Sequence, residues 1–408
     1  MSAREAKIRE WLEGQRDAEA RFLAGIVKVP SDNPPGDCAP AAAAAAAQLE
    51  ALGFAVERHP VPEALVRENG MISATNLVVR RRFGPGPVVA LNAHGDVVPP
   101  GEGWSVDPYG AVVRDGVMYG RGVAVSKSDF ATYAFALKAL EAAGHARGTV
   151  ELHFTYDEEA GGAIGPAWLL SEKISKPDYA ISAGFSYAIT TAHNGCLHLE
   201  VAVRGKSAHA AEPQRGADAL EAATRILAAL YALRPELART VSKTPGIGTP
   251  NLTVGLIKGG INTNVVPDLV TFRLDRRIVP EENPAEAEAG LRRCIEAAAR
   301  GLAGIQVEVR RILLAEPLVP RAGSEKLIAA IGRHARAILG EEIAATGVPL
   351  YTDARHYSAA GIPTVLYGAG PRTLAESGGH RADERLVLDD LWKATAIVAL
   401  ALADLLDG

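Results

Sequence analysis

The chain has 408 residues, of which 43 are basic and 48 are acidic, and its net charge is -5. This length exceeds a usual single core and predicts two domains, or a large α/β body with an insertion. The two signs of charge are intermixed and no apolar run reaches the roughly 18 residues of a membrane helix, so we expect neither a nucleic-acid partner nor a membrane partner.

The cysteine spacing and the N-terminal residues indicate the cellular compartment in which the protein is expected. Cys38, Cys196 and Cys294 are scattered without a Cys-x-x-Cys pair, which argues against a disulfide framework and against a cysteine zinc site. Residues 2–22 mix charged residues with apolar ones at helical spacing and lack the apolar centre of a signal peptide. We therefore expect a cytoplasmic protein with a small-molecule partner.

The first part of the chain alternates helices with strands. The predicted elements are a helix through 48–52, strands at 76–80 and 88–94, a helix at 130–142, a strand at 150–156 and a helix at 166–171. This alternation predicts a parallel or mixed sheet that is covered by helices on both faces.

The pattern changes near residue 193. Strands are predicted at 196–203, 251–257, 269–278 and 305–311, and helices at 217–233 and 286–302. Strand, helix, strand, strand, helix, strand is the ferredoxin-like order. After about residue 315 the first pattern resumes, with helices at 324–339 and 388–406 and a strand at 363–367. We expect a mixed-sheet α/β catalytic domain (1–191 and 313–408) interrupted by a ferredoxin-like α+β lid or dimerisation domain (192–312).

Two predicted strands lead into residue types that commonly bind metals. One runs into His94-Gly95-Asp96, and the strand at 150–156 runs into Asp157-Glu158-Glu159. Short apolar runs of this kind are typical of interior strands in a parallel sheet, and ligands of such sheets gather beyond the carboxyl ends of the strands. His94, Asp96, Glu158 and Glu159 should therefore share one crevice.

Several stretches, taken in order, resemble the M20 family of metallopeptidases and amidohydrolases, which includes acetylornithine deacetylase, succinyl-diaminopimelate desuccinylase and carboxypeptidase G2. They are residues 94–99, Tyr119-Gly120-Arg121-Gly122, residues 155–159, Gly205-Lys206-Ser207-Ala208-His209, residues 259–267, Thr352-Asp353-Ala354-Arg355 and Gly379-His380-Arg381-Ala382-Asp383-Glu384. The resemblance covers nearly the whole chain.

The resemblance implies a metal-dependent hydrolase. His94, Glu159 and His380 would ligate the metal, Asp96 would orient the His94 ring, and Glu158 would be the general base. A metal lowers the pKa of bound water and polarises a carbonyl, and a carboxylate beside it moves the proton.

Further roles follow from the same resemblance. His209 and Asn264 would help to bind the substrate or its oxyanion, Arg276 would grip a substrate carboxylate, and Asp353 and His356 would bind substrate. The alternative for Arg276 is a solvated strand position, because most arginines lie at the surface. Related folds often dimerise through the inserted domain, so we expect a homodimer that covers an exposed sheet edge.

Two positions depart from the family pattern. Where relatives carry a bridging Asp, this chain has Val125, and where they carry Glu or Asp after the strand near 178–184, it has Gly184. Two neighbouring ions need carboxylate charge to offset their repulsion. We therefore expect one divalent ion at most, with zinc as the ion, or none. Asp129 lies four residues past Val125 and is a candidate replacement, although its simpler role is a charge at a helix N-terminus.

Three functions are consistent with this sequence. The first is hydrolysis of an amide or related C-N bond in an N-acyl amino acid or similar small carboxylate, with water activated by Glu158 beside a reduced metal site. The second is metal-independent acid-base chemistry (hydrolase, isomerase or lyase) with Glu158, His94, His380, Lys127 and His356. The third is a non-catalytic ligand-binding relative.

Overall fold

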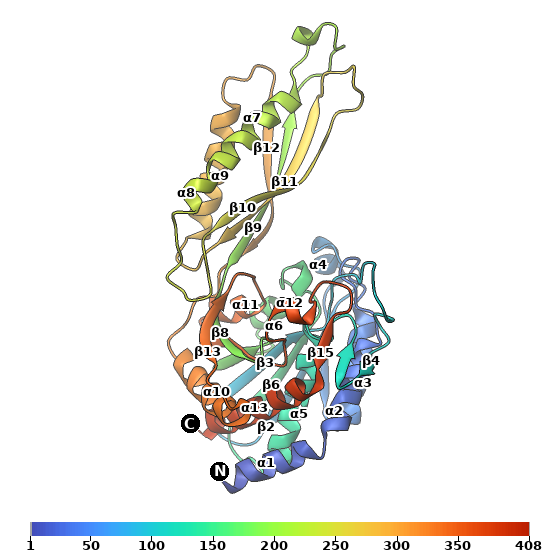
Figure 1. Ribbon diagram of the computed structural model, residues 1–408, viewed down its shortest axis with the longest axis vertical. Coiled ribbons are helices and arrows are strands. Elements are labelled where there is room, and N and C mark those ends of the chain that lie inside the picture. The colour runs from blue at the N-terminus through green and yellow to red at the C-terminus, as the bar shows by residue number, and fades with distance from the viewer. Residues whose placement is uncertain (1, 408) are drawn as a thin grey trace. The chain divides into compact units, whose positions relative to one another are not determined.

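The computed structural model describes residues 2–407, so the predicted domain limits at 1 and 408 lie outside the described residues. The chain forms two compact units. The first, which we call the main unit, runs to Thr191 and resumes over Pro320–Thr346 and from Thr352. The second, the inserted unit, comprises Ala192–Val319 and Gly347–Tyr351. Figure 1 labels their elements.

A large mixed sheet forms the centre of the main unit, with strand order β1-β2-β6-β3-β7-β14-β8-β13. The strands β6, β3, β7 and β14 run parallel, β1 and β2 are antiparallel to each other, and β14 pairs with β8 in the antiparallel sense. The bounds are β1 (Val56–Pro60), β2 (Thr75–Arg82), β3 (Val88–His94), β6 (Thr149–Thr155), β7 (Tyr179–Ser182), β8 (Ala188–His193), β13 (Ala344–Val348) and β14 (Thr364–Leu366). A separate small sheet joins β4 (Val112–Arg114), β5 (Val117–Tyr119) and β15 (Arg385–Val387).

Helices cover both faces of the large sheet, as the alternating pattern predicts. On β3, Val89 and Leu91 face the main core with α5 and α13, whereas Ala90 packs on the other face with Tyr357 of α11. The helices are α1 (Ala3–Glu13), α2 (Arg16–Val27), α3 (Ala39–Ala51), α4 (Glu63–Glu68), α5 (Lys127–Ala142), α6 (Pro166–Ser171), α10 (Ser324–Leu339), α11 (Ala354–Ala359), α12 (Leu374–Ser377) and α13 (Leu388–Asp407), with a 3-10 turn η1 (Glu158–Ala160).

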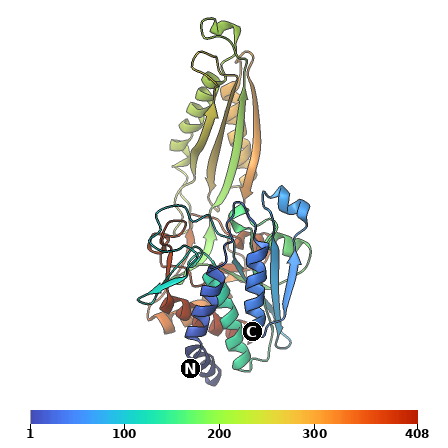
Figure 2. The same cartoon turned by 90° about the vertical axis from the view of Figure 1, so that its right-hand side faces the viewer.

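The inserted unit is an antiparallel sheet of order β10-β11-β9-β12 with helices packed against it (Figure 2). Leu199 and Phe272 of the sheet share a core with Ile226 of α7 and Ile295 of α9. Its elements are β9 (Gly195–Arg204), η2 (Pro213–Arg215), α7 (Ala219–Ala232), α8 (Arg234–Leu237), β10 (Asn251–Gly259), β11 (Leu269–Ile278), α9 (Pro284–Ala299) and β12 (Gln306–Ala315). The chain order of these strands and of α7 and α9 is the ferredoxin-like one, whereas a role as lid or dimerisation domain stays a prediction.

The predicted fold class, α/β with a mixed sheet and helices, is confirmed. The helix expected at 324–339 is α10, and the helix expected at 130–142 begins three residues earlier, at Lys127. The three-residue strands β4, β5 and β15 were not expected, because such short segments carry no readable periodicity. None of the helices within residues 2–407 combines the length and apolar character that crossing a membrane requires.

A buried carboxyl group lies between α2 and α13. Glu19 of α2 is 1% exposed, and its Oε1 accepts a hydrogen bond from Thr395 of α13. Burial raises the pKa of Glu19 to about 8, against the opposing effects of the Thr395 hydrogen bond and the Arg16 charge. The folded chain therefore binds this proton more tightly than the unfolded chain does.

We expect the free energy of unfolding to fall as pH rises from about 5 to about 8, by about 1 kcal/mol per pH unit from this group. Glu19→Gln is neutral throughout and should lose this part of the pH dependence, so the variant gains stability relative to the wild type as pH rises. Urea unfolding at several pH values measures the difference, with the exposed Glu10→Gln as control. Parallel pH profiles for wild type and Glu19→Gln would contradict the prediction.

Candidate active site

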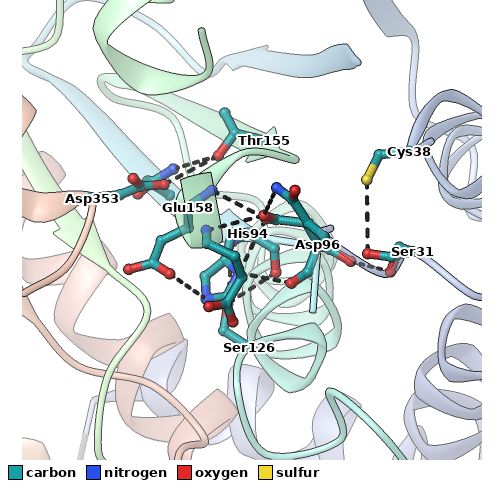
Figure 3. Close-up of polar contacts among 12 residues, drawn as sticks. Ser31, Cys38, His94, Asp96, Ser126, Thr155, Glu158 and Asp353 are labelled. Atoms are coloured by element: carbon teal, nitrogen blue, oxygen red, sulfur yellow. Dashed lines mark hydrogen bonds and ion pairs between the residues drawn. The ribbon is translucent and has the colours of Figure 1, made fainter. Parts of the chain in front are cut away.

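The predicted crevice lies at the carboxyl ends of the parallel strands. His94 is the last residue of β3 and pairs with Thr155, the last residue of β6. Asp157 follows β6, and the turn η1 then carries Glu158 and Glu159. The parallel register thus brings His94, Asp96, Glu158 and Glu159 to one edge of the sheet, as the sequence predicts (Figure 3 labels three of them).

Asp96 connects these residues. Its side chain is fully buried, its Oδ1 accepts the N–H of Glu158 at 3.2 Å, and its Oδ2 accepts the N–H of Glu159 at 3.1 Å. Asn33 donates a further hydrogen bond from Nδ2 to Oδ2 at 3.0 Å. The Asp96 carboxylate therefore fixes the backbone of the turn that carries both glutamates.

Asp96 also orients the His94 ring. The Nδ1 of His94 donates to the backbone oxygen of Asp96 at 3.0 Å and lies 3.4 Å from its Oδ1. A neutral His94 therefore carries its proton on Nδ1 and presents the lone pair of Nε2, the arrangement typical of a metal-binding histidine. The Ser126 hydroxyl accepts the His94 N–H at 3.1 Å and donates to the His94 oxygen at 3.0 Å, which secures the end of the strand.

The side chains at this edge form a group that could hold a metal ion. Donor atoms of His94, Glu158 and Glu159 all lie within 4.8 Å of one another. The His94 Nε2 lies 4.0 Å from Glu158 Oε2, and the His380 Nε2 lies 3.3 Å from Glu159 Oε1. Imidazole and carboxylate ligands at this spacing suit a divalent ion such as zinc.

The charges in this cluster depend on one another. Burial opposes the charging of His94, but the Asp96 hydrogen bond and the carboxylates of Glu158 and Glu159 raise its pKa well above the usual value. Burial, together with Glu159 and Asp96, raises the pKa of Glu158 to about 8 against the opposing charge of His94. The hydrogen bond to Glu159 is the main cause of a raised pKa for His380. A bound dication replaces protons in such a cluster, so metal binding releases them.

A second buried carboxylate holds the loop beside the cluster. Glu384 and Arg121 are both 1% exposed and form an ion pair of 2.7 Å. The Glu384 oxygens also accept the N–H groups of Gly122 (3.1 Å), Ala124 (3.0 Å) and Val125 (3.1 Å). Arg121 and Glu384 lie within motifs that resemble those of the family, but no role was predicted for either residue. Glu384 thus fixes the backbone of Val125 from a position only four residues after His380.

Residues 90–404 match the sequence model of Peptidase family M20/M25/M40. The chain belongs to peptidase family M20. It is 31% identical over 388 residues to a succinyl-diaminopimelate desuccinylase of Methylobacterium sp. (strain 4-46), covering 91% of this chain and 92% of the relative. It is 28% identical over 371 residues to an acetylornithine deacetylase of Myxococcus xanthus, covering 89% and 91%.

The fold agrees with this membership. The dipeptidase Dug1p of Saccharomyces cerevisiae superposes with a TM-score of 0.81 at 15% identity, with full coverage of both chains. At that identity the likeness shows the fold alone. The family match and the desuccinylase and deacetylase relatives make this M20 chain an amidohydrolase.

Val125 and Gly184 are the two positions expected to depart from the family pattern. Val125 is partly buried and its apolar side chain offers no ligand atom. A Cβ built on Gly184 would lie 2.7 Å from the Tyr367 nitrogen and 2.8 Å from the Leu366 carbonyl carbon. The backbone of β14 therefore occupies the space that a side chain at 184 would need.

Asp129, the candidate replacement, is engaged elsewhere. It is 1% exposed in the first turn of α5, and its Oδ1 accepts the Ala369 N–H at 2.7 Å. A Cβ built on Gly368 would lie 1.9 Å from that same Oδ1. Burial raises the pKa of Asp129 to about 7, although hydrogen bonds from Ala369 and Gly184 lower it. Asp129 therefore supports the backbone around Gly184, and the described donor group of His94, Glu158 and Glu159 does not include it.

Asp353 and His356, expected to bind substrate, lie against the glutamate turn. Asp353 is buried and accepts a hydrogen bond from Thr155 at 3.4 Å, and burial raises its pKa well above the usual value. The His356 Nε2 lies 3.2 Å from the Gly161 oxygen. A Cβ on Gly162 would meet the Asp353 carboxylate at 2.2 Å and His356 Nε2 at 2.7 Å. Both residues pack close to the backbone of this turn, and their contact with substrate stays a prediction.

The other expected substrate residues belong to the inserted unit. His209 and Asn264 are exposed neighbours, because His209 pairs with Val265 and Ala210 donates its N–H to the Asn264 oxygen at 3.0 Å. Arg276 is 3% exposed and its guanidinium contacts the Glu282 carboxylate. A grip on a substrate carboxylate by Arg276 would therefore compete with this ion pair.

We expect Glu384→Ala to destabilise the protein by about 3–5 kcal/mol, because it leaves the buried Arg121 without a counter-charge. Glu384→Gln keeps an oxygen for the N–H groups of Ala124 and Val125 and should cost less. Urea unfolding measures both, and Glu63→Ala, which removes an exposed ion pair to Arg67, is the control and should have little effect. A loss from Glu384→Ala no larger than that from the control would contradict this account of the loop.

Proposed function

We propose that this M20 amidohydrolase cleaves the amide or a related C-N bond of an N-acyl amino acid or a similar small carboxylate, with Glu158 as general base beside a single metal site. The observation that supports this most strongly is the Asp96 carboxylate, which accepts both glutamate N–H groups while the Asp96 backbone oxygen fixes the His94 tautomer. A pure binding protein has no need for a base held beside a pair of ligands.

His94, Glu159 and His380 would hold the ion, and two imidazoles with one carboxylate are a known catalytic zinc set. His94 and Glu159 belong to the close donor group, which contains Glu158 as its third member, whereas His380 approaches Glu159 alone. When bound, a divalent ion polarises the scissile carbonyl and lowers the pKa of water. Val125 and Gly184 offer no carboxylate to offset the repulsion between two ions, and this supports the proposal of a single ion.

Glu158 moves the proton. Its side chain is 14% exposed, and its backbone is held by Asp96, so the carboxylate can reach the crevice while its anchor stays fixed. It accepts a proton from water as the water oxygen bonds to the carbonyl carbon, and it delivers that proton to the departing nitrogen as the C-N bond breaks. The side chains of His94 and Glu159 are the charged neighbours of Glu158 during this proton transfer.

The proposed substrate class is based on the names of the relatives. Their names specify removal of a succinyl and of an acetyl group, and the proposal extends N-acyl removal to this chain. His209, Asn264, Arg276, Asp353 and His356 are the proposed substrate-binding residues. The ion pair of Arg276 with Glu282 opens if Arg276 takes the substrate carboxylate.

The second candidate is metal-independent acid-base chemistry on the same scaffold. It is favoured by the absence of acidic residues at 125 and 184 and by the position of His94, whose Nε2 lies 4.0 Å from Glu158 Oε2, so that an imidazole and a carboxyl group face the same space. Activity that survives complete removal of metal would select this candidate. A protein that binds N-acyl amino acids without turning them over would be the ligand-binding relative.

We also propose that the chain forms a homodimer through the inserted unit. β10 is an edge strand, and Leu256, Ile257 and Ile261 on or just after it are 61%, 54% and 79% exposed. An unpaired edge with exposed apolar side chains is a template for pairing with another chain.

We expect Glu158→Gln to lower kcat at least about a hundredfold with little change in substrate binding, because the amide keeps the size of the side chain but accepts no proton. The assay follows hydrolysis of a panel of N-succinyl and N-acetyl amino acids and dipeptides, with the exposed Glu172→Gln as control. Wild-type kcat in Glu158→Gln would remove Glu158 from the reaction.

Light scattering at micromolar concentration should give the mass of a dimer for the wild type. Ile257→Asp places a charge on the β10 edge and should shift the mass towards the monomer, whereas Val113→Asp, at an exposed valine of β4 in the main unit, should not. A monodisperse wild-type monomer would refute the dimer.

A further inference from the structure

Three chemically different side chains meet on one face of the sheet in the inserted unit. Along β9, Leu197 and Leu199 point into the core, so Cys196 and His198 lie on the opposite face. Asp275 of β11 pairs directly with His198 in the antiparallel register. The strand pairing thus brings a thiol, an imidazole and a carboxylate together from positions almost eighty residues apart.

Their donor atoms lie close to one another. The Cys196 Sγ lies 3.2 Å from His198 Nε2 and 3.4 Å from Asp275 Oδ2, and these two atoms are 2.9 Å apart. In a catalytic triad the histidine uses one ring nitrogen for the nucleophile and the other for the carboxylate. Here both partners meet the same Nε2, which is how ligands surround an ion.

The spacing is close to that of a zinc site. Bond lengths of about 2.3 Å to sulfur and about 2.0–2.2 Å to nitrogen and oxygen, at tetrahedral angles, place ligand atoms about 3.4–3.6 Å apart. The cluster would have to open by no more than about 0.5 Å. Cys196 is buried, whereas the side chains of His198 and Asp275 are 36% and 26% exposed, so two ligands can adjust and admit an ion from solvent.

Arg277 holds the third ligand in position. Its Nε donates to Asp275 Oδ1 at 3.0 Å, which leaves Oδ2 on the side of Cys196 and His198. Outer hydrogen bonds of this kind orient carboxylate ligands. A thiolate and a carboxylate supply two negative charges to a dication, and the Asp275 charge is shared with the Arg277 guanidinium.

We propose that Cys196, His198 and Asp275 form a zinc site in the inserted unit, with a fourth position open to solvent. The donor set of sulfur, nitrogen and oxygen selects zinc over magnesium or calcium, which prefer oxygen ligands. The proposal departs from the expectation of no cysteine zinc site, which was based on spacing along the chain and could not include a ligand from another strand.

Cobalt(II) tests this site without reference to activity, because a cobalt–thiolate bond gives a charge-transfer absorption in the near ultraviolet. The proposed ligands His94, Glu159 and His380 contain no sulfur and are silent in that band. The metal-free full chain is titrated with Co²⁺, and the band should grow and saturate at one equivalent of thiolate-bound cobalt per chain. Added Zn²⁺ should abolish it by displacement.

Matched variants assign the ligands. Cys196→Ser should abolish the band and weaken the corresponding Zn²⁺ binding step at least about tenfold in calorimetry, whereas Cys294→Ser, at the partly buried cysteine of α9, should leave both unchanged. His198→Gln and Asp275→Asn keep the thiol and should each weaken cobalt binding at least about tenfold. The proposal is overturned if the wild type gives no band, if the band survives Cys196→Ser, or if both His198→Gln and Asp275→Asn bind cobalt as the wild type does.

Discussion

The arrangement of residues in the candidate active site depends on the buried carboxylate of Asp96. Its two oxygens accept the N–H groups of Glu158 and Glu159, and its backbone oxygen accepts the Nδ1 proton of His94. Asp96 therefore fixes the turn that carries the proposed base, Glu158, and the proposed ligand Glu159, and it also fixes the tautomer of His94. The parallel register of β3 and β6 also positions the site, because it brings His94 beside the end of the strand that leads to this turn.

Val125 and Gly184, the two positions expected to carry acidic residues, lie in tightly held stretches of backbone. Position 184 is closed by β14, and Asp129 binds the Ala369 N–H and supports the same region with a carboxyl whose pKa burial raises to about 7. Glu384 meanwhile holds the Val125 loop through three N–H groups and Arg121. These contacts hold the backbone at both positions, and a single substitution to an acidic residue at 125 would leave position 184 without one.

The features that could be predicted from the sequence are those that local residue patterns determine. Short apolar runs followed by His94 and by Glu158 indicated strand ends, and the switch of pattern near residue 193 indicated the change of architecture. Contacts between distant segments could not be predicted in this way. The partners Arg121 and Glu384 are 263 residues apart, the crowding at Gly184 comes from β14, and the meeting of Cys196 with Asp275 requires the register of β9 and β11.

The central claim is that one ion beside Glu158 is sufficient for hydrolysis. The most direct test is a zinc titration of the metal-free Cys196→Ser protein, in which the thiol site is removed, with the rate of N-acyl amino acid hydrolysis recorded at each addition. The account predicts no activity without metal and a linear rise that reaches its plateau at one equivalent of zinc per chain. Full activity in the metal-free protein, or a plateau only at two equivalents, would contradict it.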